Sequence, residues 1–168
     1  MCASESACPG PTHTIRIAVA DDVPGLVRLV NVAFRVEQPF IEGDRIDAEG
    51  VRGYMEKGRF LLTEDSAGLA GCVYVELREG RGYVGLLGVD PLRQGTGLGR
   101  KLMRAAEDYF REAGCSVVDL RIISPRTALL DFYRHLGYSQ TGTAPFATDV
   151  PIKIPCHCIL MSKRLSAS

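Results

Sequence analysis

Apolar positions along the chain repeat with two spacings, and the two spacings alternate. A period of two is typical of half-buried strands, and a period of about 3.6 is typical of amphipathic helices. Period-two or continuous apolar runs predict strands at 14–18, 60–63, 69–77, 83–89, 117–123, 138–143 and 155–163. Helical spacing predicts helices at 22–34, 47–57, 98–113 and 125–136. This order of elements predicts a mixed α/β (α+β) fold.

Two connections set the arrangement of the central strands. The turn at residues 79–82 is expected to fold the strand at 69–77 back antiparallel onto the strand at 83–89. The helix at 98–113 then joins the strand at 83–89 to the strand at 117–123. Because such crossovers are right-handed and join parallel strands, these two strands are expected to lie parallel. A ligand site is expected at the mouth between them.

Composition narrows the class of protein. The chain has 168 residues, of which 46% are hydrophobic, so a single domain spanning residues 13–165 is expected. Residues 1–12 are small, polar and interrupted by prolines, and we expect a disordered tail there. Twenty basic residues balance twenty acidic ones, which points to neither a nucleic acid nor a membrane as partner. With no long apolar run or leader, a cytoplasmic location is expected.

The segment after the strand at 83–89 has the composition of a phosphate-binding loop. It stops at Asp90-Pro91, passes through three glycines at 95, 97 and 99, and continues as a helix. Glycine tolerates positive φ, which lets several backbone N–H groups face one anion. The unpaired amides and the positive dipole end of the helix add to this attraction.

Two common phosphate loops do not match. A P-loop ends in Gly-Lys-Ser/Thr, whereas Arg100 and Lys101 follow Gly99 here. A dinucleotide fingerprint starting at Gly95 would require glycine at position 100. A nucleotide-binding oxidoreductase therefore remains only as a third hypothesis, which stabilisation by NAD would support.

The pattern Gln/Arg-x-x-Gly-x-Gly/Ala does match, at Gln94, Gly97 and Gly99. The preceding VDP and the downstream LLDFYRHLGY lie at the spacing of the same family. On these motifs the chain resembles the GCN5-related N-acetyltransferase (GNAT) family over about residues 14–163. The resemblance implies a mostly antiparallel sheet of six to seven strands flanked by about four helices. It also implies a splayed parallel pair at the site for acetyl-CoA, and no metal.

The resemblance assigns coenzyme contacts to the end of the strand, the loop and the start of the helix. Gly88 either kinks the strand or serves packing. The expected coenzyme-binding residues are Leu87, Gly88, Val89, Gln94, Gly95, Thr96, Gly97, Leu98, Gly99 and Arg100.

Two residues are candidates for proton transfer. Tyr133 matches the family's tyrosine and is expected to protonate the leaving thiolate, the alternative being a core tyrosine with a buried hydroxyl. Relatives often carry a carboxylate on the strand before the loop, but residues 83–89 have none. Glu76 on the adjacent strand is the best candidate for the base, the alternative being a solvated glutamate at a strand end.

Several charged residues and cysteines complete the picture. Glu37, Glu42 and Asp44 could attract a cationic substrate. Arg126 replaces an asparagine of relatives and could meet a coenzyme phosphate, an acidic substrate group or solvent. Cysteines 72 and 115 lie in apolar strands, where a thiolate is disfavoured, which argues against an acyl-cysteine. In Cys156-His157-Cys158 the histidine points away from the two thiols, so a metal site is not expected.

The resulting interpretation is an acetyl-CoA dependent N-acetyltransferase that uses a small-molecule or peptide primary amine by direct attack in a ternary complex. The alternative is an inactive acyl-CoA-binding sensor or scaffold. A monomer and a homodimer are both compatible with the sequence.

Overall fold

The computed structural model describes residues 13–147 and 150–167. The tail expected to be disordered, at residues 1–12, lies outside this part. Seven strands form one sheet in the order β1-β2-β3-β4-β5-β7-β6. The strands are β1 (Ile15–Ile17), β2 (Arg59–Asp65), β3 (Gly68–Arg78), β4 (Arg81–Val89), β5 (Val117–Ile123), β6 (Ser139–Pro145) and β7 (His157–Arg164). The α-helices are α1 (Val23–Ala33), α2 (Ala48–Lys57), α3 (Leu98–Glu112) and α4 (Thr127–His135).

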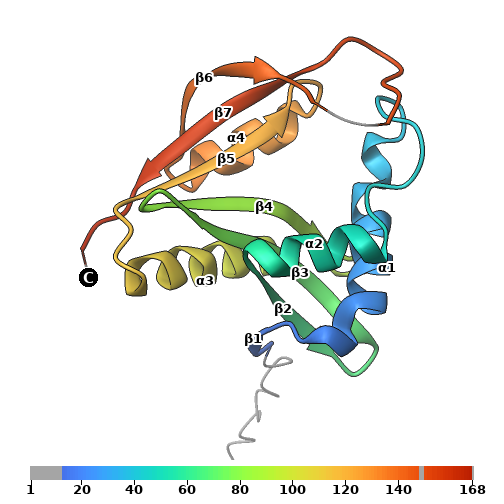
Figure 1. Cartoon of the computed structure of the whole chain (residues 1–168), viewed down its shortest axis with the longest axis horizontal. Helices are drawn as coiled ribbons and strands as arrows, with labels where there is room; N and C mark the ends of the chain where they lie inside the picture. Colours follow the sequence, from blue (N-terminus) through green and yellow to red (C-terminus); the bar gives the residue numbers. More distant parts are fainter. Residues whose placement is uncertain (1–12, 148–149, 168) are drawn as a thin grey trace, which may run out of the picture.

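Helices cover both faces of the sheet (Figure 1). One buried cluster joins α1 and α2 to Phe60 and Tyr74, and the other joins α3 and α4 to Val75 and Leu120. Successive residues of β3 alternate between the two clusters, as a strand buried on both faces requires. Among the residues described, no helix is long and apolar enough to cross a membrane.

The hairpin and crossover expected from the sequence are both present. Glu79 and Gly80 form a two-residue turn, with φ of 49° and 78°. Strand β4 pairs parallel with β5 only from Gly82 to Val84. Beyond that point β4 stays with β3, and β5 stays with β7 as far as Ile123. The two strands therefore separate, and the predicted splayed parallel pair is confirmed.

The bend in β4 lies at Leu86 rather than at Gly88. The register with β3 shifts between Gly85 and Gly88, and Leu86 has a φ of 46°. Gly88 is paired with Cys72, and a Cβ at this position would lie 3.2 Å from the Cβ of Ala33. Gly88 thus serves close packing against α1, which was the alternative reading of that glycine, and the bulge supplies the kink.

Two loops that are distant in the sequence, the one after α1 and the one between β6 and β7, form a wall beside the point where β4 and β5 separate. Ile41 bridges to Ile152, and the backbone N–H of Lys153 donates to the carbonyl of Phe40. The ammonium group of Lys153 also donates to the carbonyl of Gln38, at 2.8 Å. The loop between β6 and β7 is thereby held against the segment that follows α1, in the upper right of Figure 1.

Candidate active site

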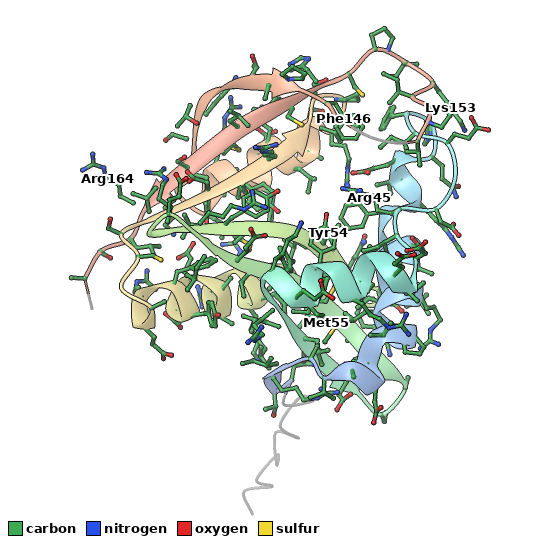
Figure 2. All side chains as sticks on the ribbon, in the orientation of Figure 1. Arg45, Tyr54, Met55, Phe146, Lys153 and Arg164 are labelled. Carbon is green, nitrogen blue, oxygen red and sulfur yellow. The ribbon has the colours of Figure 1, made fainter. Side chains whose placement is uncertain are left out.

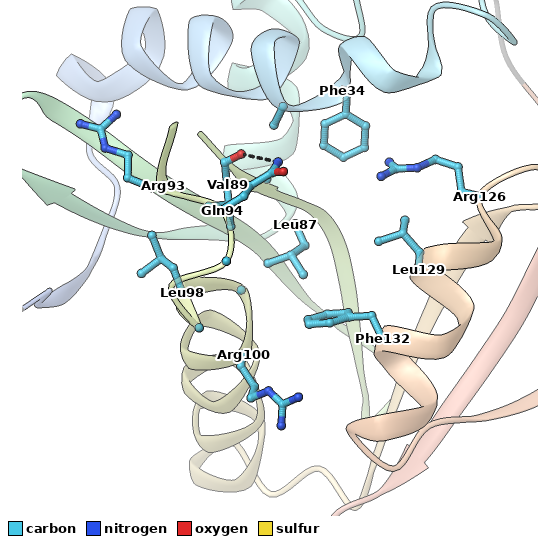
Figure 3. A pocket seen from close by; sticks show the side chains of 15 residues that line it. Phe34, Leu87, Val89, Arg93, Gln94, Leu98, Arg100, Arg126, Leu129 and Phe132 are labelled. Atoms are coloured by element: carbon cyan, nitrogen blue, oxygen red, sulfur yellow. Dashed lines mark hydrogen bonds between the residues drawn. The ribbon is translucent and has the colours of Figure 1, made fainter. Parts of the chain in front are cut away.

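A cavity of about 390 Å³ lies where β4 and β5 separate (Figure 3). Its floor is the end of β4 and its sides come from the glycine loop, the start of α3, the end of α1, and α4. The lining residues are Ala33, Phe34, Leu87, Gly88, Val89, Arg93, Gln94, Gly95, Gly97, Leu98, Gly99, Arg100, Arg126, Leu129 and Phe132. We call this cavity the coenzyme cleft, because most of the residues expected from the sequence to bind the coenzyme line it.

Side-chain hydrogen bonds hold the loop between β4 and α3 in place. The carboxylate of Asp90 accepts a hydrogen bond from the backbone N–H of Leu92, at 2.8 Å. Arg93 donates to both oxygens of Asp65, at 2.7 and 2.9 Å. The side-chain amide of Gln94 donates to the carbonyl of Val89, at 3.3 Å. These bonds fix the loop before any ligand arrives, which lowers the entropy lost on binding.

The three glycines at 95, 97 and 99 have two different roles. Gly95 and Gly97 have φ of 79° and 80°, the left-handed region in which glycine is favoured. Gly99 lies inside α3 and does not have a positive φ, so it does not use the left-handed backbone that glycine tolerates. A Cβ there would stand 3.6 Å from the Phe132 ring and 3.8 Å from Val89. Its missing side chain leaves room in the cleft.

The start of α3 offers unpaired donors to an anion. The first intrahelical bond runs from the N–H of Lys101 to the carbonyl of Gly97, and no side chain caps the helix. The amides of Leu98, Gly99 and Arg100 therefore have no intrahelical acceptor. Arg100 lines the cleft, is exposed, and has no ion-pair partner among the described residues. Each amide bonded to a charged oxygen contributes about 1.5–3 kcal/mol, so this cradle fits a pyrophosphate.

Nine of the ten coenzyme-binding residues expected from the sequence line this cleft, and Thr96 does not. The Thr96 hydroxyl turns back and donates to the carbonyl of Arg93, at 2.7 Å. Arg126, left open from the sequence, also lines the cleft. Phe34 and Phe132 are additional lining residues. Their helical apolar spacing indicated burial but not that they border a cavity.

A second cavity, of about 280 Å³, adjoins the first and shares Phe34, Leu87 and Leu129 with it. It lies between the bulged part of β4, the C-terminal end of β5 and the two loops that form the wall described above. Its other lining residues are Glu37, Arg45, Tyr54, Tyr83, Val84, Gly85, Leu86, Arg121, Ile122, Ile123, Tyr133, Phe146, Ala147 and Cys158. We call it the acceptor cavity.

Tyr133 is one of the residues that line the acceptor cavity. It is 6% exposed, and its ring packs edge-on against Phe132 and Tyr138, with centroids 5.1 and 5.8 Å apart. Among the described residues, none forms a hydrogen bond with its hydroxyl. Burial raises the pKa of Tyr133, and the nearby Arg126 partly opposes this rise. The hydroxyl therefore keeps its proton at neutral pH.

Glu76 lines neither cavity. Its carboxylate accepts hydrogen bonds from Arg78, at 2.7 and 3.0 Å, and from the hydroxyl of Tyr74, at 2.7 Å. The bond from Arg78 holds the pKa of Glu76 below its usual range. Arg78 lies 3.6 Å from the ring centroid of Tyr83, which does line the acceptor cavity. Glu76 thus reaches the cavity only through Arg78 and Tyr83.

Glu37 is the carboxylate that lines the acceptor cavity. It is 7% exposed and lies between Arg126, at 3.3 Å, and Arg45, at 3.7 Å. Glu42 and Asp44, the two other acids of this loop, are exposed and line neither of the two cavities. Of the three acids considered from the sequence, the fold brings only Glu37 to the site.

The sequence profile of the Acetyltransferase (GNAT) family matches residues 25–138, well over half of the chain. The chain belongs to the GNAT family. The resemblance read from Gln94, Gly97 and Gly99 is thereby confirmed, as is the fold that it implied.

This GNAT chain aligns with only part of each curated relative. A mycothiol acetyltransferase from Saccharopolyspora erythraea is 33% identical over 138 residues, covering 79% of this chain and 46% of that protein. The chain spans about half the length of the curated relatives it matches. The relatives are named as acetyltransferases, and each name describes the whole protein, of which this chain matches about half.

Solved structures share the fold at low identity. Ard1 from Thermoplasma volcanium superimposes with a TM-score of 0.76 at 16% identity, over 92% of this chain and 98% of that one. The putative acetyltransferase yncA from Salmonella typhimurium, solved with its cofactor acetyl-CoA, gives 0.70 at 22% identity, over 92% and 95%. These likenesses establish the architecture of the GNAT chain and no more.

The cysteines of this GNAT chain are poorly placed for covalent catalysis. Burial raises the pKa of Cys72 to about 12, and this thiol lines neither cavity. Cys158 does line the acceptor cavity, but burial raises its pKa as well. Among the described residues, no group of three or more His, Cys, Asp or Glu side chains could hold a metal ion.

Proposed function

We propose that this chain is an acetyl-CoA dependent N-acetyltransferase that passes the acetyl group to a primary amine by direct attack in a ternary complex. One observation carries the proposal. The coenzyme cleft and the acceptor cavity meet at Phe34, Leu87 and Leu129, and Tyr133 lies on the acceptor side of that junction.

The chain would hold the coenzyme with its glycine loop and with β4. The amides at the start of α3 and the side chain of Arg100 would bind the phosphates. The edge of β4 beyond Val84 lacks a partner in β5, so its backbone groups are available to an extended amide-containing arm. Acetyl-CoA supplies an activated thioester carbonyl. Residues 87–89 would place that carbonyl at the junction of the two cavities.

Tyr133 is proposed as the general acid. As the new C–N bond forms and the C–S bond breaks, the departing sulfur gains negative charge and needs a proton. The Tyr133 hydroxyl has no competing hydrogen bond among the described residues, and its raised pKa keeps the proton available. Water entering the acceptor cavity can return the proton afterwards.

The acceptor amine must lose a proton before or during attack. For an amine with a pKa near 10.4, this costs about 4–5 kcal/mol at pH 7. Glu76 was the base predicted from the sequence, and it would have to act through Arg78 and Tyr83. Glu37 is ion-paired with two guanidinium groups. Since no described carboxylate in the cavity lining lacks an ion pair, we propose that the proton leaves to water.

The passive alternative, an acyl-CoA-binding sensor, uses the same cradle and differs only in turnover. The absence of an unpaired carboxylate from the described lining favours it, and the position of Tyr133 favours catalysis. The acceptor remains a small-molecule or peptide amine. One curated relative is named mycothiol acetyltransferase, and one solved structure of the same fold, at 18% identity, is a ribosomal-protein-S18-alanine N-acetyltransferase from Escherichia coli.

Two measurements test the proposal in sequence. Thermal unfolding with acetyl-CoA at about 100 times its dissociation constant should show a stabilisation of about 2.7 kcal/mol. NAD should give no shift. Release of free CoA should then depend on an added primary amine, with the acetylated amine detected by mass. Stabilisation without amine-dependent release would favour the passive module, and stabilisation by NAD alone would favour the oxidoreductase.

A further inference from the structure

The acceptor cavity carries more positive than negative charge. Arg45 and Arg121 both line it, and Glu37 is the only carboxylate among its described lining residues. Glu37 is also engaged by Arg126 from the coenzyme cleft, at 3.3 Å. Glu37 thus forms ion pairs with Arg45 and Arg126, and no ion pair between Glu37 and Arg121 is present. Arg121 is exposed, and no described residue forms an ion pair with it.

Arg45 and Arg121 reach the same space from different elements. On β5, Leu120 and Ile122 are buried toward α3 and α4, so Arg121 lies on the opposite face, toward the cavity. Burial raises the pKa of both Tyr83 and Cys158, and both guanidinium groups oppose that rise. Tyr83 and Cys158 lie on the strands that flank β5. The two guanidinium groups therefore act on the same part of the cavity.

The neighbouring arginines are already neutralised. Arg78 is held by Glu76, at 2.7 Å, and Arg81 is held by Asp119, at 2.6 Å. Arg78 and Arg81 line a separate cavity and do not line the acceptor cavity. Arg121 differs from them in having no protein carboxylate to bind. An arginine that lines a cavity and has no carboxylate partner is free to bind an anionic group of a ligand.

Aromatic rings form the rest of the acceptor cavity. Phe34, Tyr54, Tyr83 and Phe146 come from four different elements, and Figure 2 shows Tyr54 and Phe146 on the side of the molecule where Arg45 also lies. Such a lining favours a ligand with an apolar body and only a few polar groups.

Building on the proposed function, we propose that the acceptor is an amine that also carries an anionic oxygen group, a carboxylate or a phosphate. Arg121 binds this group together with Arg45, while the amine lies at the junction near Tyr133. An amino acid with an apolar side chain has this chemistry. A simple cationic amine or a polyamine does not.

Turnover gives the first test. Amino acids with aliphatic and aromatic side chains would be compared with their own amides, which keep the amine and lose the negative charge. O-phosphoethanolamine supplies the phosphate arm. For the wild type, kcat/KM should be about 10- to 100-fold higher for the acid than for its amide. The substitutions Arg121→Gln and Arg45→Gln should each reduce this preference at least about fivefold, mainly through KM.

A matched control comes from the same sheet. Arg164 is exposed on β7, next to β5, but lies at the opposite end from the acceptor cavity (Figure 2). Arg164→Gln removes the same charge and should keep the full preference. Equal use of acid and amide by the wild type would overturn the inference while leaving the acetyltransferase intact. A preference that survives Arg121→Gln and Arg45→Gln together would also overturn it.

Product binding tests the anion site without turnover. With CoA saturating, calorimetry should show an N-acetylated amino acid binding about tenfold more tightly than its amide, and Arg121→Gln should remove the difference. This measurement applies equally to a catalytically inactive module, so its failure is distinct from a failure of the proposed activity. Binding that ignores the negative charge, or no binding at all, would refute the anion site.

Discussion

Arg126 donates a hydrogen bond to Glu37 across 3.3 Å, joining segments that are 89 residues apart in the sequence. Arg126 precedes α4 and lines the coenzyme cleft, whereas Glu37 follows α1 and lines the acceptor cavity. The pair stands at the boundary of the two cavities. It couples the position of the acceptor wall to the helix that carries Tyr133.

Removing the charge of Glu37 should destabilise the protein. In Glu37→Gln, Arg126 and Arg45 would lose their common carboxylate, although both remain partly exposed to water. We expect the free energy of unfolding to fall by about 1–2 kcal/mol in urea titrations. Glu42→Gln, on the exposed part of the same loop, should change it by less than about 0.5 kcal/mol. Equal losses for both variants would show that the pair contributes nothing specific.

Acid should weaken the protein partly through Asp22. Its carboxylate accepts two hydrogen bonds from Arg16, each at 2.8 Å, and these hold its pKa below the usual range. As the pH falls, the Asp22 carboxylate therefore binds a proton in the unfolded chain before it does so in the folded protein. Protonation thus favours the unfolded chain, and the free energy of unfolding declines as the pH drops below about 4. In Asp22→Asn this decline should be shallower. Asp21→Asn, at an exposed neighbour without a described ion pair, should retain the wild-type curve, and a match between Asp22→Asn and wild type would contradict the assignment.

The fold could be predicted because its signals are local or topological. The alternation of spacings located each strand and helix, and the right-handed crossover put β4 and β5 parallel. Finer features could not be predicted because they depend on contacts between residues that are distant in the sequence. The close contact between β4 and α3 is an example. Gly82 leaves space for Phe110, whose ring would lie 2.5 Å from a Cβ at that position, and no local pattern reveals this pairing.

The candidate site could be predicted where backbone geometry dictates composition, and less well where side chains meet. Positive φ selects glycine, so Gly95 and Gly97 were visible in the sequence. The bulge at Leu86 could not be predicted, because leucine is not a residue type that indicates a positive φ. Glu76 was chosen by strand alternation. Only the structure shows that Arg78 holds its carboxylate outside both cavities.

Substituting Gly97 should weaken coenzyme binding through the backbone. Gly97→Ala forces a side chain into left-handed geometry, at φ of 80°, although nothing lies within 4 Å of the new Cβ. We expect about 1 kcal/mol of lost stability and a rise of at least about tenfold in the dissociation constant of CoA by calorimetry.

The matched control for the glycine loop is Gly53 in α2, which has equally open surroundings and no positive φ. Gly53→Ala should stabilise the protein by about 0.5–1 kcal/mol and leave CoA binding unchanged. Unchanged CoA affinity in Gly97→Ala would mean that the loop does not hold the phosphates.

Removing the hydroxyl of Tyr133 should slow turnover without loosening the site. In Tyr133→Phe the ring packing against Phe132 and Tyr138 persists, so CoA affinity and stability should stay near wild type. Loss of the general acid should reduce kcat about 100-fold or more. Because burial raises the pKa of Tyr133, wild-type kcat should show no loss of an acid up to about pH 9. Tyr109→Phe on α3, outside both cavities, should retain full kcat, and equal kcat in Tyr133→Phe would remove this tyrosine from the mechanism.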